Sequence, residues 1–207
     1  MTAEPARQNV DPADLLALLK SRRVVRDFST ALVEEPHLWM ILEAGRWASA
    51  ASNNRVYRLL VVRDRRRIRL VADLSPGIFS HPAAMVVICT DLRAVAAAGL
   101  ASDTDRTVFI DVGTLMMNMM AEAHALGLGA CPATSFSRGG VEVVLDLPPH
   151  ARPEAILLIG HAAARQSAPP PLPGPPQPRQ PQTRPSRLLA ELVFWERYGQ
   201  ASPLPPG

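Results

Sequence analysis

The chain has 207 residues, 47% of them hydrophobic and 20% charged, which is enough for one domain with a well-buried core and some appendages. Its net charge of +3 is too small, and its basic residues are too dispersed, to indicate a nucleic-acid-binding protein. The chain has two cysteines, which is too few for a disulfide framework. Cys89 and Cys131 lie in apolar stretches, which favours buried, reduced thiols in a cytoplasmic protein.

The N-terminal quarter of the chain predicts two helices and a loop. An aspartate followed by proline is typical of a helix start, so the first helix is expected over residues 11–21. A second helix is expected over residues 34–47, with acidic residues in its first turn. Small and polar residues then form a loop over residues 48–54. The first helix carries a leucine stripe that we expect to be buried: Leu15, Leu16, Leu18 and Leu19.

The middle of the chain predicts the core of the fold. Residues 57–62 indicate a buried strand, and a third helix begins near residue 64 with a run of arginines on its solvated face. The continuous apolar run over residues 82–90 is typical of a central strand buried on both faces. The longest helix is expected over residues 106–126, and its apolar residues cover so much of the circumference that we expect it at the centre or in a dimer interface.

The C-terminal part changes character after residue 167. A strand over residues 130–136, a short helix over 139–145 and a buried strand over 153–159 come first. Proline then dominates a tether over residues 168–186, which cannot form a core and is expected to be extended. Apolar residues resume in the last segment, over residues 187–207, which suggests docking at a distance, on a partner subunit. The chain is therefore divided into a folded domain, 1–167, this tether and a C-terminal extension.

The sequence contains no Walker loop, no Gly-x-Gly-x-x-Gly after a strand, no His-Glu-x-x-His motif and no serine nucleophile elbow. The five histidines lack metal-ligand spacing, so we expect structural or surface roles and no metal site. No signal region or bilayer-spanning apolar run is present, so we expect no membrane association. An enzyme of this sequence would take its chemistry from an organic cofactor.

Three arginines, Arg22, Arg23 and Arg26, lie within five residues just after the first helix. Guanidinium groups present several donors in a planar fork, so a cluster of them suits a bound phosphate. The alternative is a solvated basic helix end that interacts with the helix dipole. The sequence by itself leaves both interpretations open.

Four segments resemble, in order and spacing, the motifs of one family. Residues 21–28 resemble an opening Arg-Arg-Ser-x-Arg-x-Phe pattern, and residues 41–58 resemble a helix followed by Ala-Pro-Ser-x-x-Asn-x-Gln-Pro-Trp. Residues 111–148 are similar to a central helix, a Gly-Leu-Gly turn and a leucine-proline ending, and residues 187–193 to a closing Arg-x-Pro-Leu-x-Glu-x-Val. Together these segments resemble the nitroreductase family of FMN-dependent flavoproteins.

The resemblance implies an α+β fold, a three-layer sandwich with a mainly antiparallel central sheet flanked by helices, in which the C-terminal segment completes the sheet of the partner subunit. It implies a homodimer that holds FMN at each end of the interface. In this picture Arg22, Arg23 and Arg26 contact the ribityl, phosphate and pyrimidine side of FMN, with Val24 between them, and Arg187 binds the phosphate. The remaining implied contacts are Ser49, Ala50 and Asn53 from the partner subunit and Pro132, Ala133 and Thr134 near N5 of the ring.

The sequence departs from the family pattern at several of these positions. Val24 stands where serine is usual, which removes a hydroxyl from the cofactor's surroundings, and Ser49 replaces a proline. Arg55 and Val56 replace the usual glutamine and proline. The segment between residues 74 and 105 is short, so a large substrate lid is not expected.

The resemblance implies an FMN-dependent oxidoreductase that transfers a hydride from a donor, NAD(P)H, to a small organic acceptor in alternating half-reactions at flavin N5. The flavin then carries the chemistry and no side chain is assigned a catalytic role. One alternative is a flavin oxidase or dehydrogenase that tailors a natural product with a small partner protein, as the cyclic dipeptide oxidase branch does. The other is a non-catalytic flavin-storing protein.

Overall fold

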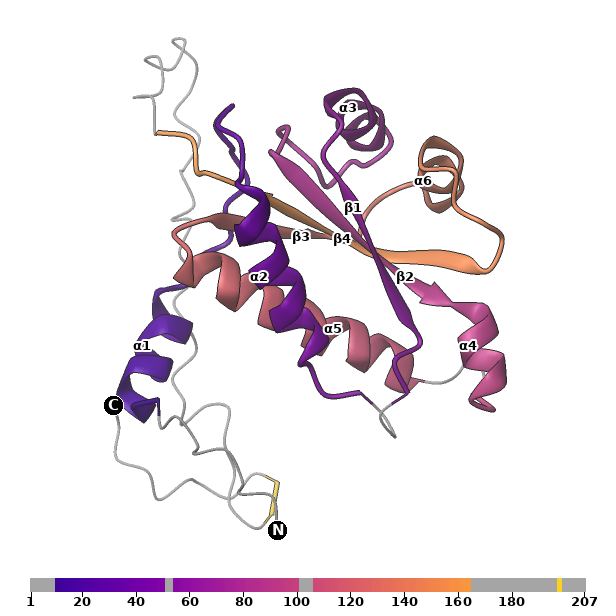
Figure 1. The fold of residues 1–207 in the computed structure, drawn as a ribbon, viewed down its shortest axis with the longest axis horizontal. Coiled ribbons are helices and arrows are strands. Elements are labelled where there is room, and N and C mark those ends of the chain that lie inside the picture. Colours follow the sequence, from indigo (N-terminus) through magenta and orange to yellow (C-terminus); the bar gives the residue numbers. More distant parts are fainter. Residues whose placement is uncertain (1–9, 51–53, 101–105, 165–196, 199–207) are drawn as a thin grey trace. The chain divides into compact units, whose positions relative to one another are not determined.

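Four antiparallel strands form the centre of the fold in the computed structural model (Figure 1). They lie in the order β1 (Tyr57–Val62), β2 (Ala84–Asp91), β4 (Ala151–Gly160) and β3 (Gly129–Ala133). The structure describes residues 10–50, 54–100, 106–164 and 197–198. The predicted tether lies outside these residues, as does the C-terminal extension apart from residues 197 and 198, so both remain predictions.

Helices cover both faces of the sheet. On one face α2 (Glu35–Arg46) packs with α5 (Arg106–Ala125), and on the other lie α3 (Arg65–Asp73) and α6 (Arg138–Val144), as Figure 1 shows. Two shorter helices, α1 (Pro12–Ser21) and α4 (Leu92–Ala97), complete the described elements. The predicted α+β sandwich with an antiparallel central sheet is confirmed.

The central strand β2 explains why the core has two halves. Every residue of β2 is buried, as its continuous apolar sequence predicts. Because successive side chains of a strand point to opposite faces, Val86 and Ile88 join the cluster under α2 and α5, whereas Met85 and Val87 join the cluster under α3 and α6. Each face of one strand therefore anchors a different helical layer.

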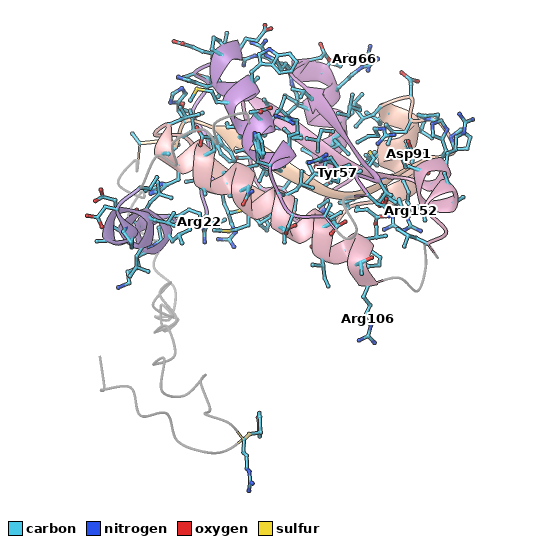
Figure 2. The ribbon with its side chains drawn as sticks, turned by 60° about the horizontal axis from the view of Figure 1, so that its bottom comes forward. Arg22, Tyr57, Arg66, Asp91, Arg106 and Arg152 are labelled. Atoms are coloured by element: carbon cyan, nitrogen blue, oxygen red, sulfur yellow. The ribbon has the colours of Figure 1, made fainter. Side chains whose placement is uncertain are left out.

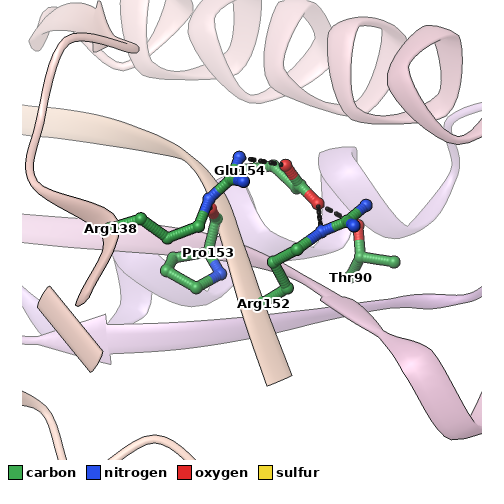
Figure 3. Close-up of polar contacts among 5 residues, drawn as sticks. All are labelled: Thr90, Arg138, Arg152, Pro153 and Glu154. Carbon is green, nitrogen blue, oxygen red and sulfur yellow. Dashed lines mark hydrogen bonds and ion pairs between the residues drawn. The ribbon is translucent and has the colours of Figure 1, made fainter. Parts of the chain in front are cut away.

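Strand β4 contains a bulge that carries a buried carboxylate. Ile88 pairs with Ala155 and Cys89 with Pro153, so Glu154 is the extra residue. Proline has no N–H for the ladder and is tolerated at such an irregularity. Figure 3 shows Glu154 between Arg138 and Arg152.

The Glu154 carboxylate, whose side chain is 3% exposed, has three donors. Arg152 Nε donates to Oε1 at 2.6 Å, Thr90 Oγ1 donates to Oε1 at 2.9 Å, and Arg138 Nη2 donates to Oε2 at 3.0 Å. Thr90 is itself fully buried. The bulge is therefore fixed by a satisfied polar cluster that ties β2, β4 and α6 together.

The predicted burial of the first helix was wrong for a single chain, and the longest helix, expected at the centre or in a dimer interface, is only partly covered by it. Helix α1 has no buried residue, and its predicted buried leucines include Leu15, which is 52% exposed, and Leu16, which is 51% exposed. Helix α5 is buried along one side only, because it packs on α2 and the sheet, and Phe109 and Ile110 are 50% and 61% exposed. Both helices keep apolar surface that one copy of the chain leaves uncovered.

The remaining differences concern element ends. Strand β3 ends at Ala133, three residues earlier than predicted, and α4 was not predicted. Asp91 caps α4 by accepting hydrogen bonds from the backbone N–H groups of Arg93 and Ala94. Aspartate is a preferred residue at a helix start, so it could have indicated this helix in the sequence.

Candidate functional site

The predicted cofactor residues near the N-terminus lie on the backbone segment that runs along β3. This arginine segment, residues 22–28, forms a parallel bridge between Val24 and Ala130, and Val25 N donates to Ala130 O at 3.1 Å. The structure therefore brings the arginines and the strand that holds Pro132 and Ala133 onto neighbouring backbones, although more than a hundred residues separate them in sequence.

The close approach requires glycine at position 129. A Cβ atom built on Gly129 would lie 2.6 Å from Val25 Cβ, which real atoms do not tolerate. Val25 is thus held against β3 by the absence of a side chain there.

We expect Gly129→Ala to lower the free energy of unfolding by about 1–3 kcal/mol, because either Val25 or β3 must move. Displacement of Val25 should also disturb the arginines on either side of it. Gly139→Ala, in α6, is the control, because nothing lies within 4 Å of its Cβ position. Urea unfolding of both variants measures the difference, and equal stabilities would contradict the packing argument.

Two hydroxyl groups fix the arginine segment at its ends. Ser21 Oγ donates to Leu18 O at 3.0 Å, so its 2.8 Å contact with His124 Nε2 places the imidazole as donor. Ser80 Oγ donates to Arg26 O at 2.8 Å and accepts from Phe28 N at 3.3 Å. The sequence carries no local motif that marks His124 or Ser80 for these positions.

Arg22 has buried donors without partners, as expected of a residue that binds an anion. It is half-buried, and its Nε and Nη1 atoms are buried without a hydrogen-bond partner among the described residues. Leaving a buried guanidinium donor without a hydrogen-bond partner costs free energy, so such donors are uncommon in folded proteins. Their presence fits an anionic group such as the FMN phosphate.

The other two arginines differ from Arg22. The Nη1 atom of Arg23 donates to Lys20 O at 2.5 Å and to Arg22 O at 2.9 Å, so this side chain curls back on the helix end. Arg26 is exposed, and its charge reaches Cys131 on β3. Arg26 therefore adds positive charge to the side of β3, and its guanidinium has no hydrogen bond or ion pair with another described residue.

Neither cysteine is arranged as a nucleophile. Burial raises the pKa of the Cys131 thiol, and the Arg26 charge only partly offsets this effect. Burial, with the charges of Glu154 and Glu142, raises the pKa of Cys89 to about 11. Both thiols are therefore protonated at neutral pH, as expected for structural cysteines.

Ser49 and Ala50 lie apart from the arginine segment in one chain. Thr114 Oγ1, on α5, donates to Ser49 O at 3.2 Å, whereas the arginine segment begins beside His124, ten residues further along the same helix. At 1.5 Å per residue the two points are about 15 Å apart along α5. Figure 2 shows Arg22 near one end of α5 and Arg106 at the other.

The remaining predicted residues differ in exposure, and two of them lie outside the described residues. Thr134 is exposed just past the end of β3, and Pro132 is half-buried. Asn53 and Arg187 lie outside the described residues. Tyr57 Oη is also buried without a hydrogen-bond partner among the described residues, and it lies on β1, at the opposite edge of the sheet from β3.

Other kinds of site were also searched for. Among the described residues, no group of three or more histidine, cysteine, aspartate or glutamate side chains could hold a metal ion. No helix in the described part of the chain is long and apolar enough to cross a membrane.

Comparison with known proteins gives a consistent result. Residues 76–161, which hold β2, α5, β3 and β4, match the model of the nitroreductase family. The FMN reductase (NAD(P)H) of Bacillus subtilis is 26% identical over 176 residues, which cover 77% of this chain and 70% of that protein. These findings show that the chain is similar to the nitroreductase family, most directly over residues 76–161.

Solved structures agree on the fold. A nitroreductase family protein from Clostridium difficile 630 superposes with a TM-score of 0.68 at 23% identity, over 87% of this chain and 96% of that one. NfrA1 from B. megaterium gives a TM-score of 0.66 at 23% identity, over 77% and 71% of the two chains. The family match does not include the arginine segment, so its role in binding remains a proposal.

Proposed function

We propose that this protein is an FMN-dependent oxidoreductase that accepts reducing equivalents from NAD(P)H and passes them to a small organic acceptor. The observation that carries the proposal is Arg22, whose Nε and Nη1 donors are buried without a hydrogen-bond partner among the described residues. The match to the nitroreductase family model and the name of the B. subtilis relative support FMN as the anion. The described residues do not favour a natural-product oxidase or a flavin-storing protein over this function.

The site is proposed to be shared by two copies of the chain. Within one chain, Ser49 and Ala50 lie about 15 Å along α5 from the arginine segment, which is consistent with a site to which a second copy contributes one of the two groups. The exposed leucines of α1 and the exposed Phe109 and Ile110 of α5 are the apolar surface that such a partner would cover.

We expect Ile110→Glu to convert a dimer into monomers, because a charge placed in an apolar interface loses its hydration. Val143→Glu is the matched control: Val143 is 78% exposed on α6, across the sheet from α5. Light scattering after size exclusion measures the mass of each variant. A dimer that survives Ile110→Glu, or a monomeric wild-type protein, would contradict a site shared through α5.

The chain's own residues have defined parts in this site. FMN, when bound, would supply the hydride-transfer chemistry that no side chain provides. Arg26 places positive charge beside β3, and Arg22 adds a second one on the same segment, where these charges would favour an anionic cofactor. Gly129 and Ser80 hold these arginines in place. Both cysteine thiols are protonated, so they do not compete as nucleophiles.

Purification of the full chain tests the function directly. A yellow protein whose released flavin is FMN, and whose absorbance bleaches on anaerobic mixing with NADH or NADPH, is the expected result. Recovery of the oxidised spectrum on addition of a quinone or nitroaromatic compound completes the reaction. A colourless protein that takes up no added FMN would refute the proposal, and a flavin that neither nicotinamide reduces would refute the NAD(P)H donor.

A further inference from the structure

A second basic cavity lies outside the proposed flavin-binding residues. Its volume is about 240 Å³, and three segments form its walls: the loop after the arginine segment, helix α3 and the loop before β2. No acidic residue is found among the described residues that line it. The lining residues are Ser29, Thr30, Leu32, Arg65, Ile68, Arg69, His81, Pro82 and Ala83.

Two arginines of α3 share this cavity. Arg65 and Arg69 are four residues apart on the helix, which places them on one face, where like charges repel. Arg65 Nη2 donates to Thr30 O at 3.2 Å, which holds this side chain against the loop wall. Among the described residues, Arg69 has neither an ion pair nor a hydrogen bond. Two adjacent guanidinium groups without an acidic partner are stabilised by an anion between them.

The cavity is shaped for a small ligand. Ile68, which is 1% exposed, and the buried Pro82 contribute an apolar lining, and a low-dielectric wall strengthens the attraction between a guanidinium and an anion. The volume is below the roughly 300–1,000 Å³ of common organic ligand sites. His81 adds a third nitrogen-bearing side chain. Three donor groups around a small cavity suit a tetrahedral anion with several oxygens better than a single carboxylate.

We propose that this cavity binds a phosphate group, either inorganic phosphate or the phosphate of a small monoester. The occupant would also stabilise the arginine segment, because Ser29 follows Phe28 directly and Ser80, next to His81, holds Arg26 O and Phe28 N. The cavity contains none of the residues proposed to bind FMN, so the proposal does not depend on flavin chemistry.

Isothermal titration of the full-length protein, saturated with FMN where it binds FMN, tests the proposal at constant ionic strength. The probes are inorganic phosphate and glycerol 3-phosphate, with chloride as the reference anion. We expect saturable binding of phosphate that Arg69→Ala and Arg65→Ala each weaken roughly 10-fold or more. Arg66→Ala, which removes the same charge from the same helix outside the cavity lining, should keep the wild-type affinity.

The outcomes separate this site from the flavin site. Retained phosphate binding in Arg22→Ala supports a separate cavity, whereas loss in Arg22→Ala with retention in Arg69→Ala would place the phosphate at the flavin site and overturn the proposal. Equal weakening by all three α3 substitutions, or a response no larger than that to chloride, would also overturn it. Tighter binding of the monoester would identify an organic phosphate as the ligand, and equal affinities would show that the phosphate group alone is recognised. Failure to bind FMN leaves each of these readouts intact.

Discussion

Arg22→Ala is expected to weaken FMN binding about 100-fold. Two buried guanidinium donors, Nε and Nη1, lack a partner, and hydrogen bonds to a charged group contribute about 1.5–3 kcal/mol each. Loss of about 3 kcal/mol corresponds to roughly two orders of magnitude in affinity. Titration of FMN into flavin-free protein, followed by quenching of flavin fluorescence, measures the dissociation constant.

In the absence of flavin, Arg22→Ala should not weaken the protein, and its free energy of unfolding should stay the same or rise. Removing donors that are buried without partners relieves a desolvation cost, so flavin-free Arg22→Ala is expected to be at least as stable as the wild-type protein. Arg66→Ala, an exposed arginine on α3, is the control and should change neither quantity. Full FMN occupancy in Arg22→Ala would remove the basis for the proposed function. Arg187→Ala, outside the described residues, is expected to release FMN as well.

Glu154→Ala should produce the largest loss of stability among the substitutions considered, about 3 kcal/mol or more. The change removes the Glu154 carboxylate from Arg152, whose side chain is 16% exposed, and from Thr90 Oγ1, which donates to it (Figure 3). Breaking a buried ion pair from one side costs about 3–5 kcal/mol, because the remaining charge stays desolvated. The shift in the midpoint of urea unfolding at fixed protein concentration gives the value.

A surface ion pair provides the comparison for Glu154. Glu35 contacts Arg63 at 3.3 Å, but its side chain is 65% exposed, so Glu35→Ala should cost less than about 1 kcal/mol. Glu154→Gln should fall between the two, since the amide oxygen still accepts a hydrogen bond while the charge is lost. Similar losses for Glu154→Ala and Glu35→Ala would mean that the bulge is held by packing alone.

The layers of the fold were predictable because each depends on a local pattern. The apolar run of β2 predicted a strand buried on both faces, and the arginine run predicted the solvated face of α3; both are confirmed. The burial of α1 could not be judged in the same way. A leucine stripe shows that a helix has an apolar face, but not whether the same chain covers that face.

The candidate site was predictable only through its motif. Three arginines in five residues suggested an anion, and the structure distinguishes them: Arg22 has unpaired buried donors, whereas Arg23 is bound to backbone carbonyls. That distinction depends on how the chain turns after α1, which composition does not reveal. Ser80 contacts Arg26, which is 54 positions away in the sequence, and His124 contacts Ser21, which is 103 positions away. No local sequence pattern encodes contacts over such separations.

The two edge strands of the sheet, β3 and β1, differ in how much of their outer side is paired. The outer side of β3 is partly occupied by Val24 and Val25, whereas β1, among the described residues, pairs with β2 alone. Any fifth strand, from whichever chain it comes, would therefore join beside β1, where the backbone still has groups to share. A strand added beside β1 would thus lie at the opposite edge of the sheet from β3 and the arginine segment, where it would not cover Arg22.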